Sequence, residues 1–333
     1  MRAVEKGRPL EGRVALVAGA TRGAGRGIAC MLGEAGATVY CTGRSTRGHP
    51  PREGPFAGRP ETIEETAEMV AARGGTGIAV RVDHLVAREV AALLARIRKE
   101  QRRLDVLVND MSEGVLHDFR PFWKVSLEKG FQALRQGVHS HLITSHAAAP
   151  LLIEGKRGLI VEITDGDFLG YRETIFYDLV KTNVNRLAYA MACELRRHGV
   201  AAVAVTPGYM RTESILDHFG VTEANWERAA KKDRFFALSE TPFFVGRAVA
   251  ALAADPQVMK KSGGLFGSWT LSEEYGFEDV DGRRPHWGRS YKAVLGRARP
   301  SGSNLAYEWT LAPSGAGGEK GRPRRRRKGE VRR

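Results

Sequence analysis

The chain has 333 residues, 42% of them hydrophobic, which is enough to bury the core of one large domain or two modest ones. Its three cysteines, Cys30, Cys41 and Cys193, form no CxxC pair, which argues against a disulfide framework or a sulfur-bound metal and favours a reducing compartment. No apolar run is long enough to span a bilayer, so we expect a cytoplasmic protein with no membrane segment.

The net charge of +14 is concentrated near the end of the sequence. Residues 314–333 hold nine Lys and Arg against two Glu, a net charge of +7, with almost no apolar side chain. Such a segment cannot bury a core, so we expect a disordered basic tail. The tail either solubilises the protein or binds nucleic acid, and we favour the first interpretation.

Apolar runs bounded by glycine alternate with helical patterns along the chain. In chain order, we expect strands over 13–18, 37–42, 77–82, 104–109, 158–164 and 200–205. We expect helices from Gly23 to Gly33 and over 61–72, 86–99, 127–153, 175–197 and 240–256. Six strands that alternate with helices predict an α/β protein with a single Rossmann-type, doubly wound parallel sheet and helices on both faces.

The segment 208–240 lacks strand character and is rich in aromatic and charged residues. It predicts a mobile helical flap beside the strand ends, where ligands bind in this architecture. The expected organisation is therefore an N-terminal arm (1–11), a Rossmann-fold domain with its flap (12–270), an extension (271–313) and the tail (314–333).

A glycine-rich turn, GATRGAG, follows the first predicted strand. Glycine allows the tight turn and the close approach of the backbone to a pyrophosphate, and the N-terminus of the next helix offers free N–H groups to the phosphates. A dinucleotide site is therefore expected here. Its contacts in the turn are Gly19, Thr21, Arg22, Gly23, Ala24 and Gly25.

The residue that reads the adenosine ribose should follow the second strand. Arg44 and Ser45 stand there, with no carboxylate to accept hydrogen bonds from a free 2′-hydroxyl. Arg44, with Arg22, offers guanidinium groups that suit a 2′-phosphate. We therefore expect NADP as the cofactor, with NAD less suitable.

Tyr177 and Lys181 are spaced i, i+4 on a predicted helix, which places both side chains on one face. A nearby ammonium favours the phenolate form of tyrosine. Such a tyrosine can give a proton to a developing alkoxide or take one from an alcohol. The pair is therefore the expected acid/base centre.

These motifs resemble those of the short-chain dehydrogenase/reductase family, and most of all its bacterial proteins similar to dehydrogenase/reductase family member 1. The resemblance runs from about Gly12 to about Gly267 and includes GATRGAGRG, RVD at 81–83, LDVLVN, the Tyr177/Lys181 pair and TPGYMRT at 206–212. It implies contacts with the cofactor from Asp83, His84, Asn109, Tyr177, Lys181, Pro207, Gly208 and Thr212. It also implies a homo-oligomer, a dimer or tetramer.

The chain departs from the family pattern in three places, the first being the family's NNAG, which reads Asn109-Asp110-Met111-Ser112 here. The position of the family's helix asparagine falls near Gly137, which has no side chain for a proton relay. Its catalytic serine lies twelve or thirteen residues before the tyrosine, where this chain has Asp165 and Thr164. Because adjacent strand residues face opposite sides, only one of these two can point at a substrate carbonyl.

Three interpretations of Asp165 stay open. Ionised, it would repel a developing alkoxide; protonated, it could donate a hydrogen bond as serine does; or it caps the following turn. The histidines His139, His141 and His146 do not share one helix face with a carboxylate, so no metal site is expected and we interpret them as solvent or packing residues.

The sequence thus predicts an NADP-dependent oxidoreductase that transfers hydride between the nicotinamide and a carbonyl or secondary alcohol, with Tyr177 as acid/base. The aromatic flap suggests an apolar small-molecule substrate. The alternative is a dinucleotide-binding sensor or scaffold with impaired catalysis, which the incomplete set of catalytic residues would explain.

Overall fold

Seven parallel strands form one sheet, in the order β3-β2-β1-β4-β5-β6-β7, in the computed structural model. The structure describes residues 7–54, 56–112, 114, 118–166, 171–172 and 174–289. The strands are β1 (Val14–Ala18), β2 (Thr38–Gly43), β3 (Thr76–Arg81), β4 (Val106–Asn109), β5 (Gly158–Ile163), β6 (Val200–Thr206) and β7 (Leu265–Gly267). This order confirms the predicted doubly wound sheet.

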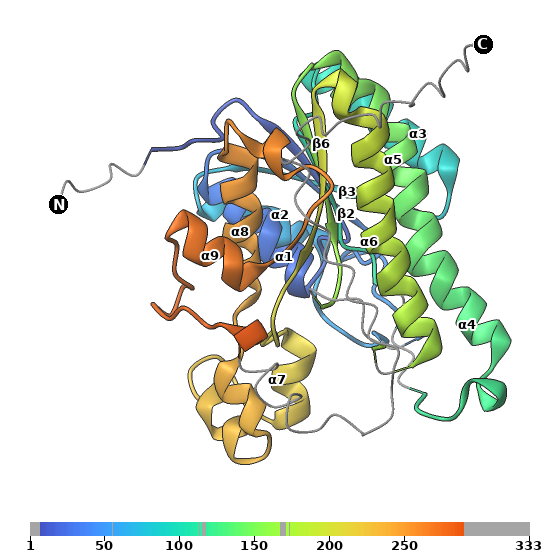
Figure 1. Cartoon of the computed structure of the whole chain (residues 1–333), viewed down its shortest axis with the longest axis vertical. Coiled ribbons are helices and arrows are strands. Elements are labelled where there is room, and N and C mark those ends of the chain that lie inside the picture. The colour runs from blue at the N-terminus through green and yellow to red at the C-terminus, as the bar shows by residue number, and fades with distance from the viewer. Residues whose placement is uncertain are drawn as a thin grey trace, which may run out of the picture.

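Helices cover both faces of the sheet (Figure 1). They are α1 (Gly23–Glu34), α2 (Ile63–Ala72), α3 (Ala87–Gln101), α4 (Leu127–Leu134), α5 (Ser140–Glu154), α6 (Ile175–Leu195), α7 (Glu213–Phe219), α8 (Pro242–Ala254) and α9 (Ser268–Tyr275). In Figure 1, α1 and α8 lie on one side of the strands, while α5 and α6 lie on the other. The carboxyl ends of the strands meet at one edge, where α7 begins.

The alternation of side chains along β1 explains the two buried faces. Ala15 and Val17 belong to the core that includes α1 and α8, whereas Val14 and Leu16 belong to the core that includes α3 and α5. Side chains of a strand point alternately to opposite faces, so a strand covered on both sides must be apolar at every position. All five residues of β1 are accordingly buried.

The predicted elements differ from the structure in two places: one strand was missed and one helix is divided. The seventh strand, β7, was missed because three residues are too short to show a periodic pattern. The helix predicted over 127–153 is divided into α4, the π-helical segment η2 (Arg135–His139) and α5. The π-helical turn inserts a residue into the helix and is centred on Gly137.

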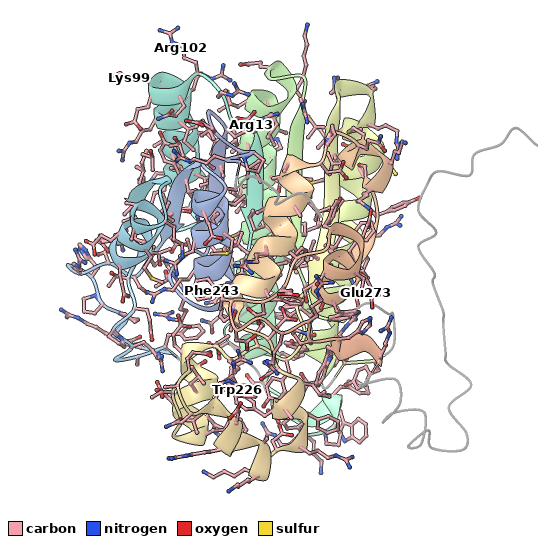
Figure 2. All side chains as sticks on the ribbon, turned by 90° about the vertical axis from the view of Figure 1, so that its left-hand side faces the viewer. Arg13, Lys99, Arg102, Trp226, Phe243 and Glu273 are labelled. Atoms are coloured by element: carbon pink, nitrogen blue, oxygen red, sulfur yellow. The ribbon has the colours of Figure 1, made fainter. Side chains whose placement is uncertain are left out.

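The segment predicted as a flap is helical and is held by a buried arginine. It contains α7 and the 3₁₀ turns η4 (Trp226–Lys231) and η5 (Arg234–Leu238). Arg211 is 1% exposed; its guanidinium pairs with Glu223 at 3.1 Å and lies 4.2 Å from the ring centroid of Trp226. Figure 2 places Trp226 at the opposite end of the molecule from Arg13, which precedes β1. The flap therefore lies at the carboxyl edge of the sheet.

The extension proposed from residue 271 packs against the flap as far as the structure describes it. Helix α9 crosses the proposed boundary at residue 270. Asp281 pairs with Arg211 at 2.8 Å, and Asp279 accepts hydrogen bonds from Thr241. The predicted basic tail lies outside the described residues. None of the helices in the described part of the chain is long and apolar enough to cross a membrane.

Candidate active site

The glycine-rich turn is built by closely packed backbone. Gly19 has φ +94°, and a Cβ placed on it would lie 2.2 Å from the carbonyl oxygen of Asp110, which follows β4. A Cβ on Gly25 would lie 2.3 Å from the carbonyl oxygen of Gly19. No residue larger than glycine fits either position without movement of the backbone. The turn therefore has the close packing that a dinucleotide site requires.

Arg22 lies within the turn and has a hydrogen-bond donor with no partner among the described residues. Its Nε donates to Glu61 at 3.2 Å, and its guanidinium lies 4.6 Å from the ring centroid of Phe56. Its buried Nη2 has no hydrogen-bond partner among the described residues. Burial lowers the pKa of Arg22, although Glu61 opposes this. A buried guanidinium N–H without a partner is costly, and an anionic ligand would satisfy it.

The end of β2 lies against this turn. A Cβ on Gly43 would lie 2.7 Å from Oγ1 of Thr21, so the two segments are in contact. Arg44 follows with an exposed side chain that makes no ion pair within the described part of the chain. The Ser45 carbonyl accepts a hydrogen bond from Ile63 at the start of α2. Arg44 and Arg22 thus lie on two segments that contact each other, the end of β2 and the turn after β1.

Glu61 is an acidic residue near the expected ribose position that the sequence analysis missed. Its side chain is buried, and it pairs with Arg22 and Arg59. Burial opposes ionisation, but the hydrogen bonds from Arg59 and Arg22 keep the pKa of Glu61 below its ordinary value. Its carboxylate is therefore already engaged by two arginines.

Glu213, the first residue of α7, contacts the glycine-rich turn. Its Oε2 accepts a hydrogen bond from the backbone N–H of Gly23 at 2.9 Å, and its Oε1 lies 3.7 Å from Nε of Arg26. Thr212 lies beside the same turn, because its Cγ2 is 3.5 Å from the position of a Cβ on Gly23. A carboxylate of the flap thus occupies a position at the N-terminus of α1 that suits an anion.

The residues expected at the adenine differ in exposure. Asp83 is partly exposed, and its Oδ1 accepts a hydrogen bond from the Leu85 amide. The His84 side chain is buried, and its two ring nitrogens hydrogen-bond to Thr42 and Thr144 at 2.9 Å. Burial lowers the pKa of His84 to about 4. Its side chain therefore links β2 to α5 and does not line the cleft, which leaves only its backbone for a cofactor contact.

Asn109, at the end of β4, belongs to a buried polar network. Its Nδ2 donates to Glu162 at 2.7 Å and to Ser145 at 2.8 Å. Nδ1 of His141 lies 2.5 Å from the second oxygen of Glu162, and Nε2 donates to the Met111 carbonyl. Burial opposes protonation, but the charge of Glu162 raises the pKa of His141 above its ordinary value. Both ring nitrogens face acceptors, an arrangement that suits a protonated imidazole.

The sequence analysis placed His141 among solvent or packing residues and did not single out Glu162. The signal was present in the strand pattern GLIVEIT, where one carboxylate interrupts an apolar run. In a strand covered on both faces, a charge must have a partner.

Tyr177 and Asp165 are in direct contact. Tyr177 lies in the first turn of α6, and its hydroxyl donates to Oδ2 of Asp165 at 2.8 Å. Nζ of Lys181 lies 5.2 Å from the centroid of the Tyr177 ring. The carboxylate therefore faces the tyrosine that was expected to act on the substrate. The turn that Asp165 was considered to cap continues into residues 167–170, which lie outside the described residues.

Thr164 points away from this contact. Its side chain is 3% exposed, and Oγ1 donates to the carbonyl oxygen of Lys181 at 3.2 Å. Adjacent residues at a strand end face opposite sides, so the orientation of Asp165 toward Tyr177 directs Thr164 to the interior. Of the two residues considered for the serine position, Asp165 is the one beside the tyrosine.

The loop after β6 carries the residues expected at the nicotinamide. Gly208, after Pro207, donates its N–H to Oε2 of Glu240 at 3.0 Å, and Ser268 donates to the same oxygen at 2.7 Å. Glu240 is 1% exposed, and its Oε1 has no partner within the described ranges. Burial raises the pKa of Glu240 to about 8. This loop is therefore held by hydrogen bonds to a buried carboxyl group whose protonated form is favoured by burial.

Comparison with known proteins gives a consistent assignment. The short chain dehydrogenase family matches residues 13–217. The human protein dehydrogenase/reductase SDR family member 1 is 34% identical over 305 residues, which cover 90% of this chain and 93% of the human one. A 7alpha-hydroxysteroid dehydrogenase of Clostridium sardiniense is 26% identical over 63% of this chain and 75% of its own.

Solved structures show the same fold. A short-chain dehydrogenase of Mycobacterium thermoresistibile superposes with a TM-score of 0.68 at 21% identity, covering 84% of this chain and 92% of that one. A candidate NAD(P)-dependent gluconate 5-dehydrogenase of Beutenbergia cavernae, with bound NADP at low occupancy, has a TM-score of 0.61 at 27% identity, covering 78% of this chain and 96% of that one. The resemblance inferred from the motifs is thus confirmed.

Proposed function

Because the chain belongs to the short-chain dehydrogenase/reductase family, we propose that it is an NADP-dependent oxidoreductase with Tyr177 as its acid/base. The observation that carries this proposal is the convergence of two features at the carboxyl edge of the sheet: the glycine-rich turn with its arginines, and the Tyr177/Lys181 pair on α6. The bound cofactor would supply or accept a hydride at the substrate carbon.

The preference for NADP is supported by the donors around the adenosine end. The buried Nη2 of Arg22 has no partner among the described residues, and the exposed Arg44 follows Gly43, which lies against Thr21 of the turn. The nearest acidic side chain, Glu61, is engaged by Arg22 and Arg59 and so offers little to a ribose hydroxyl. Two guanidinium groups suit a 2′-phosphate better than a free hydroxyl.

In this proposal Tyr177 exchanges a proton with the oxygen of a carbonyl or alcohol substrate. The ammonium of Lys181 beside the phenol ring would favour release of that proton, whereas the Asp165 carboxylate that accepts the phenol hydrogen opposes it. In the same role, Lys181 would hold the ribose hydroxyls at the nicotinamide end. Gly208 and Thr212 line the neighbouring loop and the start of α7.

Oxidation of NADPH by a panel of ketones, aldehydes and quinones tests the proposal, with Tyr177→Phe as the paired variant. General acid catalysis contributes about 10² to 10⁴ in rate. We expect Tyr177→Phe to lower carbonyl turnover by this factor while NADPH affinity stays nearly unchanged, as for a group that acts only in the transition state. Equal carbonyl turnover in both proteins would contradict the assignment of Tyr177, and NADPH binding without any turnover would favour a sensor or scaffold.

A further inference from the structure

The carboxylate of Asp165 lies beside the position that a substrate atom in contact with Tyr177 would occupy. The hydroxyl of Tyr177 donates to Oδ2 of Asp165 at 2.8 Å, so an atom within reach of the tyrosine oxygen is within a few ångströms of this carboxylate. A serine at this position would be a neutral donor, whereas an aspartate is an acceptor with a negative charge. An aspartate at this position would therefore favour a reacting group with a positive charge over one that becomes negative.

The charged groups around Asp165 include two cations, Lys181 and Arg172. Lys181, on the same helix as Tyr177, lies beside the tyrosine ring. Arg172 is buried and donates to the Gly166 carbonyl at 3.4 Å, but it also lies 3.6 Å from Asp178. On the side of β6, Gly166 meets the neutral hydroxyl of Thr206. Arg172 thus has an acidic partner in Asp178, and within the described residues Asp165 is the carboxylate in contact with the Tyr177 hydroxyl.

We propose that Asp165 adapts this site to substrates with a C=N bond, bound as the iminium cation, in preference to ketones. The inference rests on the proposed hydride transfer from NADPH. Reduction of a ketone places a negative charge on the oxygen next to the carboxylate, which is unfavourable. Reduction of an iminium ion instead removes a positive charge from a nitrogen that the carboxylate has attracted into place.

The chemistry balances without a proton from the protein. The hydride of NADPH forms the new C–H bond, the π electrons of the C=N bond become the lone pair of nitrogen, and the products are a neutral amine and NADP⁺. The iminium ion carries its proton from solution when it binds. Tyr177 can therefore keep its hydrogen on Asp165, as the structure has it, and orient the carboxylate.

A second departure from the family pattern agrees with this chemistry. Gly137, at the position of the family's helix asparagine, is buried within the π-helical turn and has no side chain that could pass a proton to the site. A reaction that needs no proton delivery during hydride transfer does not depend on such a relay. Asp165 and Gly137 are thus both compatible with the reduction of an iminium substrate.

The first test compares two bicyclic substrates of similar size, dihydroisoquinoline and tetralone, at neutral pH with NADPH. We expect the ratio of kcat/KM for the imine to that for the ketone to fall about tenfold or more in both Asp165→Asn and Asp165→Ser, because each removes the charge. Glu194→Gln, which removes an exposed charge near the far end of α6, should leave the ratio unchanged. A ratio that survives in both Asp165 variants would overturn the inference.

The second test measures binding without turnover. Protonated tetrahydroisoquinoline and the neutral alcohol tetralol are titrated into the protein and followed by ligand-observed NMR. We expect the ammonium compound to bind wild-type protein about tenfold more tightly than the alcohol, and to lose this advantage in Asp165→Asn. Equal affinities of the two compounds for wild-type protein would contradict the inference.

The two hypotheses fail in different ways. If wild-type protein does not bind NADPH, or if Tyr177→Phe reduces ketones as fast as wild type, the proposed function is wrong. If ketone reduction depends on Tyr177 while the imine-to-ketone ratio of kcat/KM is unchanged in the Asp165 variants, only the substrate inference is wrong. Thermal unfolding of each variant shows that it is folded, and Asp165→Ser, which restores the family's residue type, provides a second variant if Asp165→Asn does not fold.

Discussion

The two ends of the candidate site are shaped by different chemical groups, backbone at one end and carboxyl side chains at the other. At the turn between β1 and α1, backbone groups pack so closely that glycine is required at Gly19 and Gly25. At the ends of β5 and β6, carboxyl groups shape the site instead, with Asp165 against Tyr177 and Glu240 beneath Gly208. A site made of backbone thus tolerates little change, whereas one made of side chains can change its charge without movement of the backbone.

The largest expected effect concerns the backbone end. Gly19→Ala combines a positive φ with a contact of 2.2 Å to the Asp110 carbonyl, so the backbone must shift. We expect a loss of stability of about 2 to 5 kcal/mol and loss of measurable NADPH binding. Urea unfolding and NADPH fluorescence titration measure the two effects. Gly48→Ala is the control, since a Cβ there meets nothing within 4 Å. Equal stability and equal NADPH affinity of the two variants would show that glycine is not required at position 19.

The next effect concerns the carboxyl group beneath the loop after β6. Burial raises the pKa of Glu240 from 4.5 to about 8, so the folded protein holds a proton that the unfolded chain releases between these values. The contribution of Glu240 to stability is therefore complete below about pH 4.5 and is lost as pH rises toward 8. The loss should be on the order of 2 kcal/mol or more.

Glu240→Gln keeps a neutral group of the same shape and should remove this part of the pH dependence. Urea unfolding at the two ends of that pH range, on wild type and variant, isolates the difference. Glu274→Gln, which removes an exposed carboxylate that pairs with Lys261, is the control. If wild type and Glu240→Gln show the same pH dependence, the buried carboxyl is not neutral in the folded state.

A smaller effect is expected for the choice of cofactor. Charge-assisted hydrogen bonds contribute about 1.5 to 3 kcal/mol, and less at an exposed side chain such as Arg44. Arg44→Ala should therefore weaken NADPH binding about threefold to tenfold relative to NADH. Arg47→Ala, which removes an exposed arginine paired with Glu68, serves as control. An unchanged ratio of the two affinities in Arg44→Ala would show that Arg44 does not contact the 2′-phosphate.

The smallest expected effect concerns Glu213, whose carboxylate connects the start of α7 to the glycine-rich turn. The Glu213 carboxylate accepts a hydrogen bond from Gly23 at the N-terminus of α1, where it would repel a pyrophosphate. Glu213→Gln should therefore tighten NADPH binding about twofold to fivefold. Asp217→Asn changes an exposed charge on the same helix, paired with Arg59, and should have a smaller effect. Weaker binding in Glu213→Gln would mean that the carboxylate supports the turn rather than competing with the cofactor.

The sequence predicted those parts of the molecule that local patterns determine. Alternating apolar runs and helical periods identify the parallel sheet, because burial on both faces requires apolar strands. Glycine spacing located the turn after β1, and the i, i+4 spacing placed Tyr177 and Lys181 on one face of α6. Each of these depends on neighbours in the chain, so it is visible without the fold.

Only the tertiary structure decided which side chains meet. Glu213 reaches Gly23 across 190 residues, and His141 meets Glu162 between α5 and β5. Which of Thr164 and Asp165 faces Tyr177 depends on how the end of β5 is oriented against α6. The three residues of β7 form a strand only because β6 offers its edge. Long-range contacts of this kind leave no periodic trace in a sequence, since they arise from packing between elements rather than within them.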